Sequence, residues 1–402
     1  MKQLSVRNLS RFILFSLVSL VLVAAAGAQT TNRALQAYQE RFRDAEPEMK
    51  LNILTTADML TVEELGPLYG QVVQYALTNA GDLDSDAVLQ QIVLYAAEKI
   101  AEGGYTGVNT GLWDVFTETT NNTLRIAVLD TLGVVAQGDR ERILDLNGWI
   151  EAQTNLYRGG VVPDLQVVRK AVVTAGVLAD ASSFPMLLNV YLSQFSDQMS
   201  QTAAAAMRQL NGDYVDMAIS AIIERNLADR EPALSYFVAD LQLSDQQRAR
   251  IATEVLADTL NEVVRDVTEQ RIQRDLRYRA VRVLMSIPYE DASTPLIRHF
   301  QLTVRDYDRN VVTKAWLLDS ITALGTVGTS PAARVLTTYL SALNRVTEFE
   351  RPADTQIVLA VVTNLARLGY DLSYDALFYA TILDYPQNVK DAARQALESL
   401  TQ

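Results

Sequence analysis

Apolar and small residues recur along the chain in one arrangement, which is clearest between Trp316 and Gly325. Leu317, Ser320 and Leu324 stand at positions i, i+3 and i+7, so all three share one stripe of an α-helix. Ser320 is small enough for a neighbouring backbone to come close, and Gly325 is placed to end the helix in a left-handed cap. The pattern therefore predicts a closely packed helix that stops at Gly325.

The same arrangement returns along the chain at intervals of roughly thirty to forty-five residues. Its other copies centre on Ala96, Val128, Ala171, Ala206, Ala280, Asn364 and Ala392. One more copy is needed between Leu210 and Leu284, and two segments fit, one centred on Phe237 and one on Ala252. Such an interval is the length of one helical hairpin, and self-similarity at this interval is typical of a solenoid.

Prolines mark a second kind of helix that precedes the repeated one. Pro185, Pro295 and Pro331 each follow Ser or Thr within two residues and open an apolar run. Ser330 is expected to be an N-cap with Pro331 at the first helical position, where the missing N–H costs nothing. Each repeat is therefore predicted to be a pair of antiparallel helices, and the fold to be an all-α solenoid.

At this point the chain resembles the HEAT-repeat family and its looser HEAT-like relatives. The resemblance is carried by the proline-opened first helices and by second helices that begin with Leu124-Arg125, Val168-Arg169 or Leu276-Arg277, followed by small residues and Leu-Gly. It covers most of residues 85–400. It implies a curved right-handed stack that binds or scaffolds proteins, with the second helices on the concave wall and no common catalytic residues.

The N-terminus is typical of an export signal. Three basic residues precede an apolar core at residues 12–26, and small residues at 26–28 predict cleavage after Ala28. The core is shorter than the about twenty residues that span a bilayer comfortably, although an uncleaved anchor is the alternative. No later apolar run approaches that length. We therefore expect residues 1–28 to be removed and the protein to be periplasmic or extracellular, with no transmembrane segment left.

The rest of the chain is expected to fall into two parts. Residues 29–84 are predicted to be N-terminal capping helices, because Tyr38 and Phe42 share a stripe and a second helix follows Pro47. Residues 85–402 are predicted to form the HEAT-like solenoid. The glycine clusters at 103–111 and 159–160 are read as plain connectors, with loops of a binding face as the alternative.

Charge and composition narrow the choice of partners. The chain has 35 basic and 48 acidic residues and a net charge of −13, which disfavours nucleic acid and anionic lipid. It has no cysteine and one histidine, so disulfides, thiol chemistry and the usual zinc sites are not expected. We expect no cofactor and no metal.

One basic stripe stands out in this acidic chain. It comprises Arg271, Arg274, Arg277, Arg279 and Arg282, of which Arg271, Arg274 and Arg282 share one side of a helix. On a concave wall such a stripe would suit an acidic peptide or another anionic group, because arginine contacts carboxylates in a bidentate way. Arg271, Arg274, Arg277 and Arg282 are therefore the candidate partner-binding residues, and a solvated face with ordinary ion pairs is the alternative.

Three further features each allow a functional interpretation and a purely structural one. The alternation of Asp82, Asp84 and Asp86 is similar to the first half of a calcium loop, but the later ligands are missing, so an N-cap with acidic neighbours is favoured. His299 has no Gly-x-Ser-x-Gly partner, so we expect a packed or surface histidine. The C-terminal aromatics are expected to cover the core, with a partner surface as the alternative: Tyr370, Tyr374, Phe378, Tyr379 and Tyr385.

Taken together, the sequence predicts an exported, non-enzymatic protein that binds or scaffolds other proteins in the cell envelope. One alternative is an all-helical envelope hydrolase that uses paired carboxylates, which need two acids a few ångströms apart. Another is a purely structural spacer. The sequence carries no signal for an oligomeric state.

Overall fold

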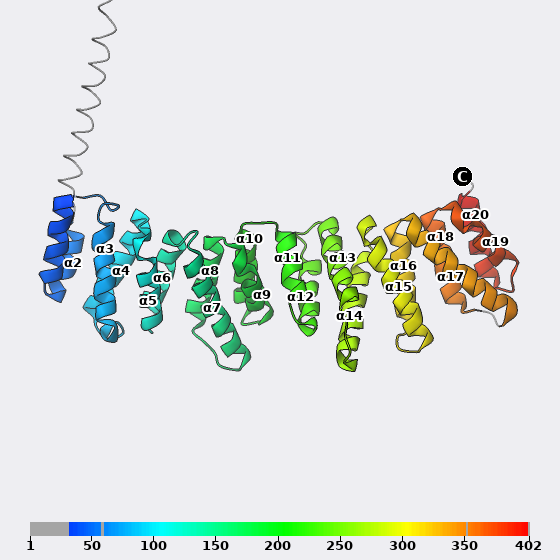
Figure 1. The fold of residues 1–402 in the computed structure, drawn as a ribbon, viewed down its shortest axis with the longest axis horizontal. Helices are drawn as coiled ribbons and strands as arrows, with labels where there is room; N and C mark the ends of the chain where they lie inside the picture. The colour runs from blue at the N-terminus through cyan, green and yellow to red at the C-terminus, as the bar shows by residue number, and fades with distance from the viewer. Residues whose placement is uncertain (1–31, 58–59, 351–352, 401–402) are drawn as a thin grey trace, which may run out of the picture. The chain divides into compact units, whose positions relative to one another are not determined.

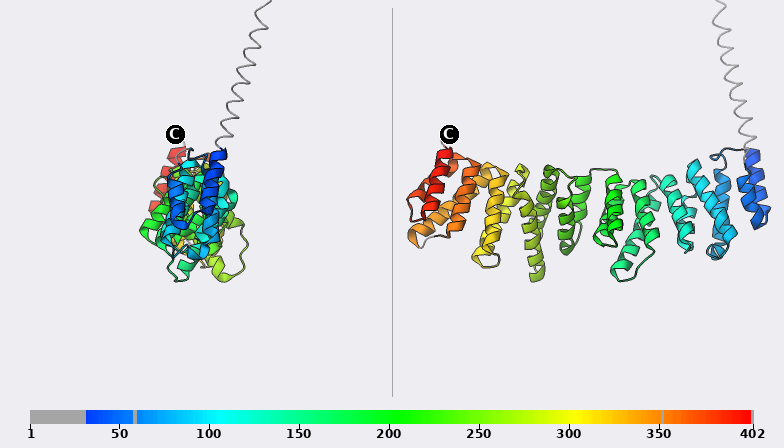
Figure 2. Two further views of the ribbon diagram at one scale, coloured as in Figure 1. Left: turned by 90° about the vertical axis from the view of Figure 1, so that its left-hand side faces the viewer. Right: turned by 180° about the vertical axis from the view of Figure 1, so that it is seen from behind.

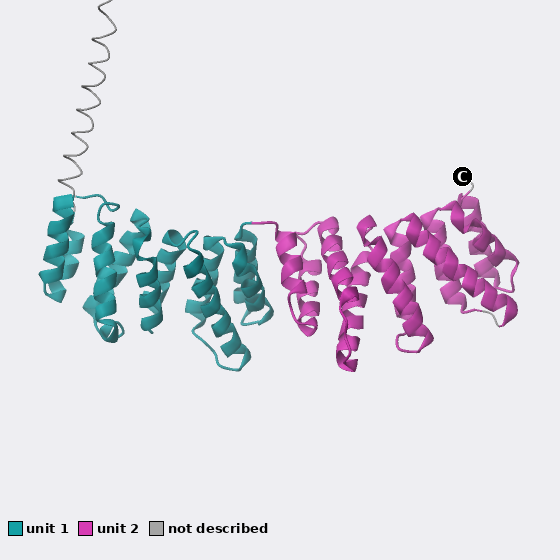
Figure 3. Cartoon of the chain, in the orientation of Figure 1, with its two compact units in different colours: residues 1–211 teal, residues 212–402 magenta. Residues whose placement is uncertain are grey.

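The computed structural model describes residues 32–57, 60–350 and 353–400. The predicted export signal, residues 1–28, lies outside this part. The chain divides into two compact units, residues 1–211 and residues 212–402 (Figure 3). The boundary falls inside the segment predicted as one solenoid, so each unit is described by itself.

Unit 1 is built of helices alone within its described residues (Figures 1 and 2). Residues 32–44 are helical and precede the labelled helices. These are α2 (Pro47–Thr55), α3 (Gly66–Thr78), α4 (Ala87–Gly103), α5 (Asn109–Glu118), α6 (Asn122–Val135), α7 (Arg140–Arg158), α8 (Leu165–Leu178), α9 (Phe184–Leu192) and α10 (Asp197–Gln209). Short 3-10 turns precede α4, α5 and α9.

Unit 2 is likewise helical throughout its described residues. Its helices are α11 (Tyr214–Ile223), α12 (Leu227–Ala239), α13 (Asp245–Asn261), α14 (Val267–Leu284), α15 (Ser293–Asp308), α16 (Lys314–Val327), α17 (Ser330–Phe349), α18 (Thr355–Leu368), α19 (Tyr374–Ile382) and α20 (Gln387–Leu400). In the part of the chain that the structure describes, no helix is both long and apolar enough to cross a bilayer.

Within each unit the helices pack in two rows. From α3 onward, an odd-numbered helix packs against the even-numbered helix that follows it, and the two form a pair. We call the odd-numbered members first helices and the even-numbered members second helices. Each second helix also packs against the second helix of the next pair in its unit, as α6 does on α8 and α16 on α18. This pairing confirms the predicted all-α solenoid architecture.

The repeated sequence arrangement forms the core of the second helices. Leu317, Ser320 and Leu324 are all buried in α16, as the stripe predicts. The structure also settles the open choice between Leu210 and Leu284. Phe237 lies in α12, a second helix that packs on α14, whereas Ala252 lies in the first helix α13.

Threonine hydroxyls tie neighbouring second helices together at one-repeat intervals. Thr131 donates to the carbonyl oxygen of Ala97 at 2.9 Å, and Thr174 donates to that of Leu129 at 3.1 Å. Both hydroxyls are buried, so each bond satisfies a polar group that would otherwise be costly to bury. These bonds couple α4, α6 and α8 in sequence.

Gly325 does not end its helix, contrary to the prediction. The helix α16 continues to Val327, and Gly328 takes the left-handed cap position with φ of 74°. Gly325 instead faces α18, where a Cβ atom would overlap the side chain of Asn364. Gly176 is similar, because its Cβ would lie 2.9 Å from the Cβ of Ala206 in α10. These glycines therefore serve close helix packing.

The predicted N-cap of α17 is also shifted by one residue. The N-cap is Thr329, and Ser330 and Pro331 occupy the first two helical positions. Thr329 makes no side-chain cap hydrogen bond, because its Oγ1 lies 2.6 Å from the Oγ of Ser293 in α15. The Thr329 hydroxyl thus joins α17 to α15 of the preceding pair.

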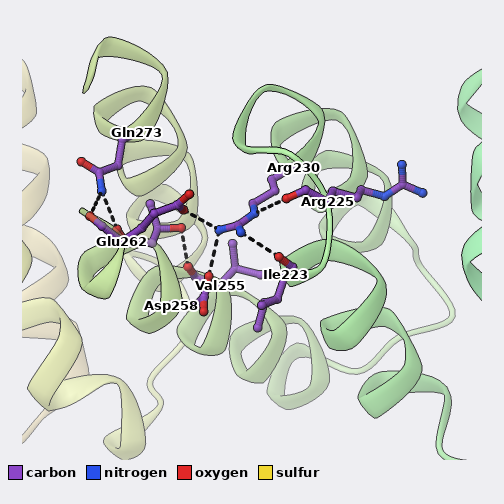
Figure 4. A network of polar contacts seen from close by, with 8 residues as sticks. Ile223, Arg225, Arg230, Val255, Asp258, Glu262 and Gln273 are labelled. Atoms are coloured by element: carbon purple, nitrogen blue, oxygen red, sulfur yellow. Dashed lines mark hydrogen bonds and ion pairs between the residues drawn. The ribbon is translucent and has the colours of Figure 1, made fainter. Parts of the chain in front are cut away.

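A buried arginine network links two helix pairs of unit 2, α11/α12 and α13/α14 (Figure 4). Arg230 donates to Asp258 at 2.8 Å and Glu262 at 2.9 Å, both near the C-terminus of α13. It also donates to the backbone carbonyls of Ile223 and Arg225 in the turn between α11 and α12. The bonds to the two carbonyls hold the turn between α11 and α12 in place. The bonds to the two carboxylates join α12 to the C-terminal end of α13.

Candidate binding surface on the second helices

Grooves run along the second helices in both units. Unit 1 has two of them, which we call the α4 groove and the α8 groove after the helix at the centre of each. Unit 2 has one beside α14, which we call the α14 groove. In each unit, the grooves and the exposed side chains around them form what we call the second-helix surface of that unit.

The α8 groove has a volume of 580 Å³ and crosses three consecutive second helices, α6, α8 and α10. Its lining is Ile126, Leu165, Gln166, Arg169, Lys170, Val173, Ser196, Gln198 and Met199. Lys170 pairs with Asp130, whereas Arg169 is exposed and makes no hydrogen bond or ion pair among the described residues. The groove thus combines aliphatic walls with amide groups and one free guanidinium.

The α4 groove is larger and less polar. It has a volume of 650 Å³ and lies among α2, α4 and α6. Its lining is Leu51, Thr55, Gln91, Leu94, Tyr95, Glu98, Ala101, Ala127, Asp130 and Thr131. Tyr95 is held in place because its hydroxyl donates to the carbonyl of Leu54 at 3.5 Å. Asp130 lines the α4 groove and pairs with Lys170, which lines the α8 groove, so the two grooves adjoin at this ion pair.

The α14 groove has a volume of 430 Å³ and a more charged lining: Glu231, Ile272, Asp275, Tyr278, Arg279 and Arg282. Arg279 bridges to α12 by an ion pair with Glu231 at 3.1 Å and a hydrogen bond to Ser235. Arg282 is exposed and makes no ion pair or hydrogen bond among the described residues. This groove therefore has one fixed and one available arginine.

Tyr278 ties the wall of this groove to the next pair. Its ring stacks on Trp316 with centroids 4.2 Å apart and planes at 4°. Its hydroxyl donates to Asp319 at 2.5 Å. Burial, together with this carboxylate, raises the pKa of Tyr278 to about 12, so the hydroxyl stays protonated and donates at physiological pH. The stacked rings and the hydrogen bond thus join α14 to α16 at the wall of the α14 groove.

The structure separates the four candidate arginines. Arg271 and Arg282 are exposed on α14, and Arg271 has only a 4.0 Å contact with Asp275. Arg274 is half-buried. Arg277 is buried, with 6% of its surface exposed, and it pairs with Asp306 of α15 at 3.7 Å. Burial lowers the pKa of Arg277. The Arg277 side chain therefore points toward α15 of the next pair and away from the second-helix surface.

The three N-terminal aspartates do not form a cation site. Asp86 is the N-cap of α4, as expected, and accepts from the amides of Val88 and Leu89. Asp84 points instead to the start of α6, where it accepts from Thr119, Thr120 and Asn121. These bonds lower the pKa of Asp84 to about 2. In residues 32–57, 60–350 and 353–400, no three acidic or histidine side chains are grouped to hold a metal ion.

His299 is a packed histidine, which is one of the two expected forms. Its Nε2 lies 3.1 Å from both Ser320 Oγ and Thr303 Oγ1. Those hydroxyls also lie within donating distance of backbone carbonyls, so Nε2 is the atom that carries the proton. Burial lowers the pKa of His299 to about 3. A neutral, enclosed imidazole of this kind has no access to a substrate.

The C-terminal aromatics differ in burial, and only some of them cover the core as expected. Tyr385 is buried and donates to Asn344 at 3.1 Å, so it belongs to the core. Tyr374 and Phe378 are exposed on α19, and their rings are parallel with centroids 6.4 Å apart. The sequence did not separate these roles, because burial depends on which neighbours α19 meets.

Sequence reasoning missed most of the second-helix surface. It did not single out Val173 or Tyr95, because an exposed valine or tyrosine has no motif of its own. The repeat does not bring Tyr278 and Trp316 together either. Superposing the copy centred on Ala280 on the copy centred on Ser320 aligns Tyr278 with Leu318, so the aromatic pair follows only from the packing of α14 on α16.

Comparisons with known proteins add little to this surface. No protein-family model matches the chain, and no curated protein matches it. One solved structure, described as "A conserved phosphorylation switch controls the interaction between cadherin and beta-catenin in vitro and in vivo", is 12% identical, with 92% of this chain and 96% of that chain covered and a TM-score of 0.30. A SYS-1/POP-1 complex is 10% identical, with 84% and 63% covered and a TM-score of 0.25. At these TM-scores the likeness carries no argument, so the solenoid assignment rests on the helix pairing.

Proposed function

We propose that this protein is a non-enzymatic, HEAT-like scaffold that holds a protein partner on its second-helix surface. The observation that carries the proposal is the groove between neighbouring second helices, which occurs in both units. Stacked repeats offer such grooves side by side, and a partner segment can lie across several of them. HEAT-like family membership is part of the proposal, supported by the proline-opened first helices.

The chemistry of the grooves favours a polypeptide over a small metabolite. The α8 groove places aliphatic side chains such as Val173 beside amides such as Gln166 and Gln198. Aliphatic walls accept apolar side chains, and amides pair with a peptide backbone, which has both donors and acceptors. Arg169 and Arg282 add unpaired positive charge, which suits acidic side chains of a partner.

A photo-cross-linking experiment tests the location of binding. A photoreactive residue replaces Val173 on the second helix α8 or, as a matched control, Leu144 on the first helix α7. The two native side chains are similarly exposed, at 39% and 49%. We expect the Val173 position to cross-link a partner protein in the native source and the Leu144 position not to. Equal cross-linking at both positions would contradict a preferred second-helix surface.

A charge reversal tests the arginine contribution in unit 2. Arg282→Glu is expected to weaken capture of the cross-linked partner by roughly ten- to a hundredfold, because one reversed contact with an acidic group costs on the order of 1.5–3 kcal/mol. The control is Arg334→Glu, an equally charged change at an exposed arginine of the first helix α17. If Arg282→Glu leaves the captured partners unchanged, Arg282 does not contribute to binding.

The site of action is proposed to be the periplasm or the extracellular space, on the strength of the N-terminal sequence pattern. The prediction is that the protein isolated from its native cells begins at Gln29, since cleavage is expected after Ala28. N-terminal sequencing of the purified protein tests this directly. Recovery of an intact Met1 terminus in the membrane fraction would instead support the uncleaved anchor.

A further inference from the structure

The last pairs of unit 2 leave a dense group of large apolar side chains in water. Phe349 at the end of α17 is 73% exposed, and Ile382 at the end of α19 is 60% exposed. Phe378 and Tyr374 stand one and two turns before Ile382 on the same stripe of α19. We call this stripe the α19 ridge. A contiguous apolar group of this kind usually marks an interaction site.

A groove runs directly beside the ridge, between the first helices α17 and α19. This α19 groove has a volume of 500 Å³, and Phe349 and Phe378 stand on opposite walls. Its floor is fixed, because Asn344 donates to the carbonyl of Ala376 at 2.9 Å and accepts from buried Tyr385. The α19 ridge and the α19 groove therefore adjoin, with Phe378 belonging to both.

The walls of the groove carry opposite charges that remain unpaired. Arg345 stands on α17 and Asp375 on α19, and both are exposed. Neither makes a hydrogen bond or an ion pair among the described residues. Glu348 differs, because its carboxylate accepts a hydrogen bond from Tyr379. One exposed cation on α17 and one exposed anion on α19 thus line the two walls of the groove.

We propose that a second copy of this chain binds here, so that the α19 ridge of each copy lies in the α19 groove of the other. Helices pack by placing ridges into grooves, and a two-fold contact requires one patch to be complementary to itself. This face meets that requirement, because it contains both parts side by side. The charges also match, since a two-fold axis brings Arg345 of each copy near Asp375 of the other.

The charge pattern distinguishes a second copy from other occupants. A lipid surface would leave Arg345 and Asp375 unpaired beside the apolar group. An unrelated helix would need its own acid and base in matching positions, whereas a second copy supplies both by symmetry. The same face therefore satisfies its apolar and charged groups in one contact.

Sedimentation of the purified protein tests the dimer. Over a concentration range of about a hundredfold, the mass is expected to rise from one chain to two, because association follows mass action. Phe378→Glu and Ile382→Lys are each expected to keep the protein monomeric. The matched control Leu241→Glu changes an 89% exposed leucine of the same unit outside the groove, and it should leave the dimer intact. A wild type that stays monomeric throughout would overturn the proposal.

A mixing experiment tests the two-fold arrangement itself. Arg345→Asp alone and Asp375→Arg alone each place like charges in contact across the axis, so each variant is expected to be monomeric. An equimolar mixture restores both ion pairs in a heterodimer, and its mass should return to that of two chains. If the mixture stays monomeric while the wild type dimerises, the proposed two-fold pairing is wrong.

The remaining occupants are outcomes of a parallel measurement. Flotation of the wild type with neutral phosphatidylcholine vesicles should show no binding, because the face is covered by the second copy. Binding to vesicles that Phe378→Glu abolishes, together with a monomeric wild type, would assign the α19 ridge to lipid instead. Circular dichroism of every variant confirms that the helices persist.

Discussion

The side chain of Asn364 in α18 occupies the space that a methyl group on Gly325 of α16 would need. A Cβ on Gly325 would overlap the side-chain amide of Asn364, which is itself fixed by a 2.8 Å hydrogen bond to the carbonyl of Ala360. The two second helices therefore approach as closely as a glycine allows.

This contact makes Gly325→Ala a destabilising change, although alanine is the better helix former. We expect a loss of ~1–3 kcal/mol in the free energy of unfolding, the usual cost of overpacking. The control is Gly148→Ala in α7, where a Cβ meets nothing within 4 Å, and it should gain ~0.5–1 kcal/mol. Urea titration of both variants measures the difference. Equal effects would show that α16 and α18 can move apart freely.

Asp84 predicts an acid-dependent link between α4 and α6. Its pKa of about 2 lies below its ordinary value of 3.8, so its contribution is complete above pH 3.8 and disappears as pH falls through about 2. Asp84→Asn should cost ~1 kcal/mol near pH 7, because Asp84 is exposed to solvent. Urea titrations at several pH values should show the two proteins converging below pH 2. A pH-independent difference would mean that the carboxylate charge plays no part.

His299 predicts a second effect of pH on stability. Here the folded protein favours the neutral form of the side chain, whereas at Asp84 it favours the charged form. Its pKa of about 3 lies below the ordinary 6.5, so the unfolded chain binds a proton that the folded chain refuses. Stability should therefore fall by about 1.4 kcal/mol for each pH unit between 6.5 and 3. As the chain has one histidine, a single imidazole NMR signal reports it directly. A signal that titrates near pH 6.5 in the folded protein would contradict the buried neutral form.

The arginines of α14 are expected to respond differently to neutral substitution. Arg277→Met leaves Asp306 without its partner, and Asp306 is largely buried, with 16% of its side chain exposed. We expect a loss of ~3 kcal/mol, as is typical when one member of a buried pair is removed. Arg282→Gln should change stability by less than ~0.5 kcal/mol, because its side chain is exposed. Thermal unfolding of the two variants tests the distinction.

The helical architecture was predictable because its signals lie within short segments of the sequence. A helix stripe repeated at one-hairpin intervals fixes which face of each second helix must be buried, and Leu317 and Leu324 are indeed buried. Proline positions likewise marked the first helices α9, α15 and α17. These signals depend on neighbours within a few turns, so no long-range contact is needed to read them.

The binding surface was less predictable, because exposure depends on the neighbouring pairs. The helical wheel of α14 placed Arg271, Arg274 and Arg282 on one side, and the structure leaves Arg271 and Arg282 exposed but Arg274 half-buried. The wheel did not reveal that Arg277 is buried and pairs with Asp306 of α15. In the same way, the identity of Tyr385 and Phe378 does not say which of them fills the core. Only packing against α17 separates them.

The sequence by itself determined that the chain is all-helical, that its helices come in pairs, and which stripe of each second helix is buried. Hydrophobic periodicity decides these features, because each pair must hide one apolar face. Only the tertiary structure decided the role of Gly325, the division into two units, the grooves between second helices and the exposed α19 ridge. Those features depend on distances between helices that are one repeat or more apart in the chain, and a single sequence does not encode such distances in any local pattern.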